Sequence, residues 1–317
     1  MFNINYTFGV DYGIVPISEY LKYQEIDEKY KEKYPWMRSV IVFVFPFSNK
    51  PVKRERYLSA RFAYGEDYHI VVKEKLEKIA EELNLQNYTT LTDVSFFDEK
   101  LLAYLAGLGG YGKNNLIITP KYGTNVAIGE IVTDLVLDYT KNLHESPCGD
   151  CDICLRACPT KAISTEGFTR TNCISYLTQY ISDEYHLYDR IFTQAVGCDI
   201  CQIVCPLNKK EYDYDPRFDF NYKSIINLNV IRNMDKHSYK EYYKTKSFHW
   251  IGYLKMLRNI LTLDTNNKNI TIEELKYFQI KYKSVQWFYN HIEYLKGKLN
   301  GNNKSSSVWT RNTTKHR

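Results

Sequence analysis

The sequence lacks any long apolar run. Its best candidate, Val40 to Phe47, has the length of a strand, whereas a helix that crosses a membrane needs about 18 apolar residues. The first ten residues also lack the basic start and apolar stretch of a secretion signal. We therefore expect a cytoplasmic protein that does not associate with a membrane.

A strong excess of charge is also missing. The 42 Lys and Arg residues against 37 Asp and Glu give a formal charge of only +5, which argues weakly for an acidic partner such as nucleic acid. Hydrophobic residues make up 44% of the 317 positions, as in an ordinary folded protein. This length is sufficient for two or three domains with buried cores.

Cysteine is absent from most of the chain, because all eight cysteines fall between Cys148 and Cys205. In a reducing compartment such clustering favours metal binding over disulfides. The composition divides the chain into an α/β domain at 1–142, a cysteine-bearing module at 143–210, a helical region at 211–300 and a polar, disordered tail at 301–317.

Periodicity predicts the elements of the first segment. A β-branched and aromatic run at 39–47 indicates a buried strand, and apolar residues at helical spacing from Val72 to Leu83 indicate a helix. Residues 100–106 predict a second helix that ends in a glycine-rich turn, and 116–119 and 125–137 predict strands. In the third segment, apolar stripes around 256–261 and 275–280 are typical of helices.

The cysteines form two spaced motifs and one isolated residue. The first motif is Cys148-x2-Cys151-x2-Cys154-x3-Cys158-Pro159, the second is Cys198-x2-Cys201-x3-Cys205-Pro206, and Cys173 lies between them. In ferredoxins with two 4Fe–4S clusters, the fourth cysteine of each run ligates the other cluster. This rule assigns one cluster to Cys148, Cys151, Cys154 and Cys205, and the other to Cys158, Cys173, Cys198 and Cys201.

Two structural zinc sites are the alternative, since four cysteines also suit zinc. Zinc sites usually combine two C-x2-C pairs, which fits poorly with three cysteines at x2-x2 spacing followed by x3-C-P. We therefore expect a module like a bacterial ferredoxin with two 4Fe–4S clusters.

The glycine-rich turn at 107–113 matches both G-x-G-x-x-G and most of a Walker A motif. A phosphate loop runs from a strand into a helix, but here a helical pattern precedes the turn and a strand pattern follows it. Asn114 also stands where a Walker A motif has Ser or Thr. We interpret the turn as a close approach of the backbone to another large group, with Lys113 either near phosphate or in solvent.

Several strings together resemble the epoxyqueuosine reductase family, cobalamin-dependent enzymes of tRNA modification. They are the segments at 64–69, 92–93 with 99–100, 106–114, 129–134, 172–178 (NCISYLT) and 197–202 (GCDICQ). The resemblance implies base-off cobalamin between the α/β domain and the ferredoxin-like module, with the turn at 107–114 near it. It also implies reduction of epoxyqueuosine to queuosine at the tRNA wobble position, with electrons from the two clusters.

The resemblance also assigns site residues. Asp93 matches the proposed proton donor, and we expect partial desolvation to raise the pKa of its carboxyl group. Asp134 is a competing carboxylate that we interpret as structural. The positions that match cobalamin contacts are Ala60, Asp93, Ile117, Ile128, Ser175 and Gly197.

The sequence departs from the family pattern at several points. Asp93-Val94-Ser95 replaces the usual Asp-Thr-Gly, Lys100 replaces an Arg, and Val196 replaces a Tyr. The HEAT-like repeats of longer members are missing. These changes affect the expected substrate contacts more than the expected cofactor.

Partners and alternatives complete the prediction. We expect a monomer that acts on tRNA with a queuosine-type anticodon and receives electrons from an unidentified donor. Another corrinoid reductase, similar to reductive dehalogenases, and a pure electron carrier are the alternatives. Basic residues interleaved with Tyr212 and Tyr214 are candidates for RNA contact or for a solvated surface: Lys209, Lys210, Arg217 and Lys223.

Overall fold

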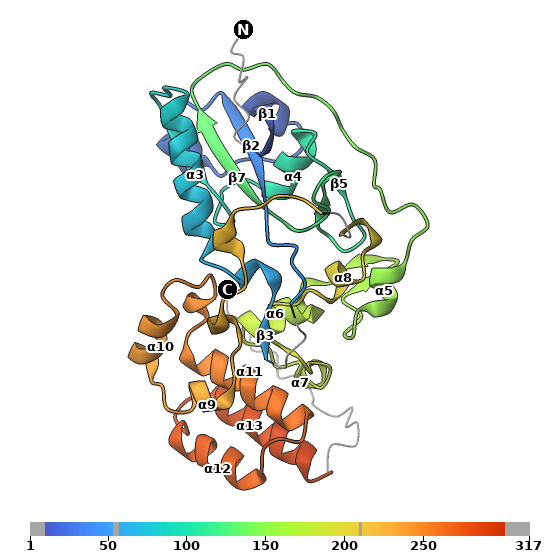
Figure 1. Ribbon diagram of the computed structural model, residues 1–317, viewed down its shortest axis with the longest axis vertical. Helices are drawn as coiled ribbons and strands as arrows, with labels where there is room; N and C mark the ends of the chain where they lie inside the picture. Colours follow the sequence, from blue (N-terminus) through green and yellow to red (C-terminus); the bar gives the residue numbers. More distant parts are fainter. Residues whose placement is uncertain (1–9, 53–56, 209–210, 302–317) are drawn as a thin grey trace.

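The computed structural model describes residues 10–52, 57–208 and 211–301. The expectations for Lys209 and Lys210, and for the tail beyond Gly301, therefore fall outside the described residues. Figure 1 shows the α/β domain at one end of the molecule, the C-terminal helices at the other, and the cysteine-bearing module beside the junction.

The first domain is built on a four-stranded sheet of order β1-β2-β7-β4. Its strands are β1 (Asp11–Pro16), β2 (Ser39–Pro46), β7 (Val126–Thr133) and β4 (Tyr88–Leu91), and every pair is antiparallel. The antiparallel order makes this an α+β domain. The predicted strand at 39–47 is confirmed as β2, which lies between β1 and β7 and is buried along its whole length.

Helices cover both faces of the sheet, and the alternation of side chains along β2 explains why. Val40, Val42 and Val44 pack with α4 (Glu99–Leu105), whereas Ile41, Phe43 and Phe45 pack with α3 (Tyr68–Glu82). Because both faces are buried, β2 reads as a continuous apolar run. Gly129 on β7 lets α3 approach closely, since an added Cβ would lie 2.9 Å from Val72. Both predicted helices of this segment are confirmed.

The cysteine-bearing module consists of short elements. Helices α5 (Ile153–Ala157) and α8 (Ile200–Ile203) pack together beside the hairpin of β8 (Ile163–Ser164) and β9 (Gly167–Phe168). Strand β10 (Gln194–Val196) pairs in parallel with β3 (Leu58–Ser59), which joins this module to the first domain.

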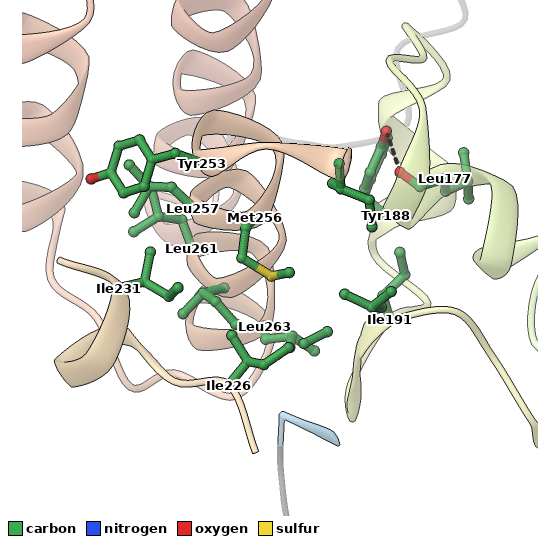
Figure 2. Close-up of a cluster of buried hydrophobic side chains, with 14 of the residues drawn as sticks. Leu177, Tyr188, Ile191, Ile226, Ile231, Tyr253, Met256, Leu257, Leu261 and Leu263 are labelled. Atoms are coloured by element: carbon green, nitrogen blue, oxygen red, sulfur yellow. Dashed lines mark hydrogen bonds between the residues drawn. The ribbon is translucent and has the colours of Figure 1, made fainter. Parts of the chain in front are cut away.

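The C-terminal region forms a helical core that also takes in part of the cysteine-bearing segment. Figure 2 shows Leu177, Tyr188 and Ile191 packed toward Met256 and Leu263, which both lie on the helix Tyr253–Asn266. The helices are α6 (Ile174–Gln179), α7 (Tyr185–Tyr188), α9 (Leu228–Ile231), α10 (Lys236–Tyr243), α11 (Tyr253–Asn266), α12 (Ile272–Lys281) and α13 (Gln286–Leu299).

Three details differ from the sequence predictions. Strand β7 ends at Thr133, before the predicted end at residue 137, and β1 and β4 were not predicted. The C-terminal α-helices begin at Leu228, because the chain from 211 to 227 first runs back over the α/β domain. There Phe218 is buried with α3 and its ring lies 5.2 Å from that of Phe47. The remaining short elements are α1 (Ile17–Tyr20), α2 (Glu28–Lys33), β5 (Gly110–Tyr111) and β6 (Ile117–Ile118).

Candidate active site and cluster module

One predicted set of four cysteines lines a single cavity. Its wall contains Cys148, Cys151, Cys154 and Cys205, together with Asn114, Ile118 and Leu207. Burial and the neighbouring thiols of Cys148, Cys151 and Cys205 raise the pKa of Cys154. The set draws three members from one loop and one from a motif about fifty residues away, as in ferredoxins with two clusters.

The other predicted set gathers where α6 begins and β10 ends. Cys173 is the N-cap residue of α6, and Cys198 follows β10 after a single glycine. Burial raises the pKa of Cys201 to about 12, and repulsion from neighbouring groups, Cys173 first among them, adds to this shift. Burial likewise raises the pKa of Cys173, with Cys158 as its charged neighbour. Burial also raises the pKa of Cys198, which has Cys201 and Cys173 among its neighbours. The four side chains of this set therefore lie near one another.

The glycine-rich turn lies against the first cysteine set. The Lys113 amide donates to Cys148 Sγ at 3.4 Å, and its Nζ donates to the carbonyls of Gly149 at 2.7 Å and Cys151 at 3.0 Å. Lys113 is exposed, in line with the solvent alternative given from the sequence, and it also supports the loop of a predicted cluster. Helix α4 precedes the turn, β5 lies within it and β6 follows it, which confirms the predicted helix-to-strand order, the reverse of that in a phosphate loop.

A cavity lies between the sheet and the cysteine-bearing module. Asp93, Ile117 and Ile128, three of the predicted contact residues, line it. Gln202, which follows Cys201, lines the same cavity and places it beside the second cysteine set. Its other lining residues include Phe47, Arg61, Phe62, Tyr68, Glu99, Lys100, Leu116, Thr124, Asn125, Val126 and Ala127.

The other three predicted contact residues lie on the module side. An added Cβ on Gly197, whose φ is +68°, would lie 2.6 Å from Ala60 and 2.7 Å from the ring of Phe62. Phe62 lines the cavity, so the close contact between Gly197 and Phe62 lies directly behind the cavity wall. Ser175 lies on α6, and the hydroxyl of Thr178 on the same helix accepts a hydrogen bond from the Gly197 amide at 2.9 Å. The structure thus links Ala60 and Gly197 to the cavity through Phe62.

The loop that carries Asp93 has an unusual backbone. Asp93 has a φ of +56°, in the left-handed region that few residues other than glycine adopt. Side-chain contacts hold this conformation: the Asp93 amide donates to Glu99 Oε2 at 3.2 Å, and Ser95 Oγ donates to Glu130 Oε2 at 2.6 Å. Residues held in such regions cluster at functional sites.

His69 joins Asp93 to a second carboxylate. Its Nε2 lies 3.1 Å from Asp93 Oδ2, and its Nδ1 lies 2.6 Å from Asp67 Oδ1. Because both ring nitrogens face carboxylate oxygens, the protonated imidazolium, which donates from both, satisfies both contacts. Burial opposes the charge, but the hydrogen bonds to Asp67 and Asp93 raise the pKa of His69 to about 9.

The expected rise in the pKa of Asp93 is wrong. The hydrogen bond from His69 lowers it, against the opposing effect of burial. The Asp93 side chain is also 52% exposed, so desolvation is incomplete. At neutral pH the proton of this pair therefore resides on His69, one hydrogen bond from Asp93.

Two further carboxyl groups surround the loop. Burial raises the pKa of Glu99 to about 7, with the charge of Asp93 adding to the shift, and burial raises the pKa of Glu130 to about 8. Sequence reasoning did not assign a role to His69, Glu99 or Glu130, although each belongs to a string that carries the family resemblance. Their pairing with the Asp93 loop depends on tertiary contacts that no spacing reveals.

Other sequence candidates lie elsewhere. Asp134 accepts a hydrogen bond from Asn87 at 2.7 Å, in line with its structural interpretation. Arg217 is paired with Glu74 and Asp215, and Lys223 Nζ donates to the carbonyl of Tyr242. These two side chains are therefore engaged within the chain.

The cysteine arrangement is that of an iron–sulfur protein with two clusters. Residues 147–208 match the family described as a 4Fe-4S double cluster binding domain, and residues 28–98 match the family described as Epoxyqueuosine reductase QueG, DUF1730. The module is therefore a binding domain for two 4Fe–4S clusters.

Named relatives and solved structures agree with these matches. An epoxyqueuosine reductase of Francisella cf. novicida is 31% identical over 292 residues, which cover 83% of this chain and 79% of the relative. The chain belongs to the epoxyqueuosine reductase family. A relative from Lactococcus garvieae is 39% identical over 170 residues, 50% of this chain, but the match spans only about half (48%) of that relative.

Two solved structures share the fold at 25% sequence identity, and each match covers 91% of this chain and 86% of the chain in the solved structure. One is an epoxyqueuosine reductase with an epoxyqueuosine-modified tRNA-Tyr stem loop, at a TM-score of 0.77. The other, from Bacillus subtilis, has its catalytic aspartate loop swung out of the active site, at a TM-score of 0.78. None of the helices in the described ranges is long and apolar enough to span a membrane.

Proposed function

We propose that this chain reduces epoxyqueuosine to queuosine at the wobble position of tRNA. The observation that carries the proposal is the Asp93–His69 pair at a cavity beside the second cysteine set, in a chain of the epoxyqueuosine reductase family. The solved relative with a modified tRNA stem loop supports a tRNA with a queuosine-type anticodon as the partner. Such a substrate would place the reaction in the cytoplasm.

Each cysteine set is suited to one cluster. We infer that Cys148, Cys151, Cys154 and Cys205 hold one, and that Cys158, Cys173, Cys198 and Cys201 hold the other. The second set lies beside the cavity through Gln202, whereas the first lies beneath the glycine-rich turn. Electrons from an external donor would therefore leave the module through the second cluster.

We infer that the cavity is part of the site for the cobalamin that the family resemblance implies. Its wall is apolar along Val126, Ala127 and Ile128, it borders the cluster module, and the Asp93–His69 pair lies at its edge. The residues that would hold the cofactor are Ala60, Asp93, Ile117, Ile128, Ser175 and Gly197. Bound cobalamin would supply electrons from its cobalt to the epoxide.

The chain's own contribution is proton transfer. Removing the epoxide oxygen as water takes two electrons and two protons, so protons must reach that oxygen. We propose that Asp93 Oδ2 delivers the first after taking it from His69 Nε2, which carries a proton near neutral pH, and that the second comes from solvent through the same pair. The left-handed backbone at Asp93, held by Glu99 and Glu130, aims the carboxyl group at the cavity.

The test is conversion of epoxyqueuosine to queuosine in tRNA by the full chain, with both clusters reconstituted and reduced viologen as the electron source. We expect product only when cobalamin is added. Activity without cobalamin would contradict the cofactor assignment, and reduction of halogenated arenes without conversion of the tRNA would favour another corrinoid reductase.

A further inference from the structure

An exposed cluster of aromatic and cationic side chains lies at the end of α6, outside the cavity. The rings of Tyr176 and Tyr180 stack with centroids 4.8 Å apart, and the Tyr180 and Trp250 centroids are 5.7 Å apart. The guanidinium of Arg170 lies 5.6 Å from both tyrosine ring centroids, and Lys255 Nζ lies 5.2 Å from that of Trp250. We call these five residues the aromatic surface.

The aromatic surface is open to solvent. Trp250 is 45% exposed and Tyr180 is 38% exposed, so part of each side chain is open to solvent. Among the described residues, neither Arg170 nor Lys255 forms a salt bridge with a carboxylate. Uncovered aromatic planes with cations beside them are what unpaired nucleotides bind, since bases stack on the rings and phosphates meet the cations.

A short chain of contacts also connects the aromatic surface with the candidate active site. His249 precedes Trp250, and its Nδ1 lies 3.9 Å from Asp67 Oδ2. Asp67 in turn contacts His69, the partner of Asp93. Ser175, a predicted cobalamin contact, precedes Tyr176 on α6. An RNA strand with one base in the cavity would therefore bring its neighbouring nucleotides to this surface.

The surface is held in place by the C-terminal core. Arg258 on α11 is fully buried, and its guanidinium donates to the carbonyls of Leu177 at 2.7 Å and Tyr180 at 2.9 Å. These contacts fix the end of α6 and the backbone of Tyr180 before any ligand arrives. A pre-ordered surface loses less conformational freedom on binding.

We propose that Arg170, Tyr176, Tyr180, Trp250 and Lys255 bind unpaired nucleotides of the tRNA anticodon loop that flank the nucleotide in the cavity. This inference rests on the proposed function, because it takes the tRNA as the substrate. It adds a stacking surface built from side chains that the cluster and cavity assignments leave unused: Arg170 before α6, Tyr176 and Tyr180 along and just after α6, Trp250 before α11 and Lys255 on α11.

The test measures binding and does not depend on catalysis. The full chain with its clusters is titrated at fixed salt with an unmodified anticodon stem-loop RNA, and separately with an RNA duplex of equal length that has no unpaired bases. We expect Trp250→Ala to weaken binding of the stem loop roughly ten-fold, the usual effect of losing one stacked base, and to leave duplex binding unchanged. Trp250→Phe, which keeps a ring, should restore most of the affinity.

Tyr277→Ala is the matched control. Tyr277 is 58% exposed on α12 and also has a lysine over its ring, with Lys281 Nζ 5.8 Å from the centroid, but it belongs to a distant helix. Equal binding by the Trp250→Ala and Tyr277→Ala proteins, or equal losses for stem loop and duplex, would overturn the inference. Trp250-dependent binding without epoxyqueuosine reduction would support the surface and contradict the proposed function, whereas reduction with Trp250-independent binding would contradict the surface alone.

Discussion

At the scale of single residues, the candidate site depends on how two charged side chains share a proton. Asp93 alone is a poor reservoir at neutral pH, because the hydrogen bond from His69 lowers the pKa of its carboxyl group. The pair as a unit retains a proton, because the pKa of His69 is raised to about 9. Asp93 can therefore act as the donor while His69 stores the proton.

Replacing Asp93 with Asn tests the donor. The amide has a similar shape but cannot transfer the proton, so we expect conversion of epoxyqueuosine to fall on the order of 10² or more, the usual weight of general acid catalysis. Cobalamin and cluster spectra should be unchanged. Asp134→Asn is the control, because that carboxylate accepts from Asn87 and Thr133 and does not line the cavity, and we expect its rate to match the parent. If the Asp93→Asn protein converts epoxyqueuosine as fast as the parent, another residue must be the proton donor.

The pH dependence of the rate tests whether His69 holds the proton that Asp93 transfers. The pKa of His69 is raised from 6.5 to about 9, so the imidazolium and its stabilising contacts with Asp67 and Asp93 are fully present below 6.5 and are lost as the pH rises through about 9. We expect the single-turnover rate to fall over the upper part of this range. His69→Gln keeps a hydrogen-bond donor that does not titrate, so its rate should be lower but should lose the alkaline decline. A change near pH 7 in both proteins would belong to Glu99, whose pKa is about 7.

At the scale of elements, α11 organises the second cysteine set without contributing a ligand. Asn259 donates to the carbonyls of Thr178 at 2.7 Å and Ala195 at 2.8 Å, and Arg258 holds Leu177 and Tyr180. Thr178 and Ala195 belong to α6 and β10, the elements that Cys173 precedes and Cys198 follows. A helix far along the chain therefore sets the spacing of two predicted ligands.

Arg258→Met tests this organisation. The change removes a donor from the carbonyls of Leu177 and Tyr180 and from Asn259 Oδ1, of which the Leu177 carbonyl keeps the Tyr188 hydroxyl. A buried group left without a donor costs about 1–3 kcal/mol of unfolding free energy. We expect a clear loss in thermal stability and a lower occupancy of the second cluster, measured by iron content and electron paramagnetic resonance. Arg232→Met is the comparison, because its ion pair with Glu274 is partly exposed and should contribute only about 0–1 kcal/mol. Equal losses in the two proteins would count against a special role for Arg258.

At the scale of the whole molecule, the second cysteine set draws on three distant stretches of chain. Cys158 ends the first motif, Cys173 caps α6, and Cys198 and Cys201 open the second motif. The first set, by contrast, takes three members from one loop and Cys205 from the second motif. Each cluster can therefore be removed separately.

Metal analysis tests the assignment. The parent should contain about eight irons per chain after anaerobic reconstitution, and Cys173→Ala should retain about four, because only the second cluster loses a ligand. Cys205→Ala should lose the first cluster instead. In the electron paramagnetic resonance spectrum of the reduced protein, the signals of two clusters should be replaced by the signal of one cluster in both variants. Zinc near two with almost no iron would contradict cluster binding.

The sequence by itself determined the cluster module and most regular elements of the α/β domain. Cysteine spacing is local chemistry, so the motifs at 148–158 and 198–205 identify 4Fe–4S binding without a fold. The apolar run of β2 and the helical spacing in α3 likewise report burial directly. Short elements escaped prediction: β4 has four half-buried residues, too few for a periodic signal, and β1 was also missed.

Only the tertiary structure decided the protonation of the site and the position of the turn at 107–114. The pKa of Asp93 depends on the charge and hydrogen bond of His69, which lies 24 residues earlier and reaches it through the packing of α3 on the sheet. Lys113 likewise meets Gly149 and Cys151 because the cysteine loop folds onto the turn. Electrostatic energies depend on distance in space, and spacing along a chain does not encode that distance when the partners belong to different elements.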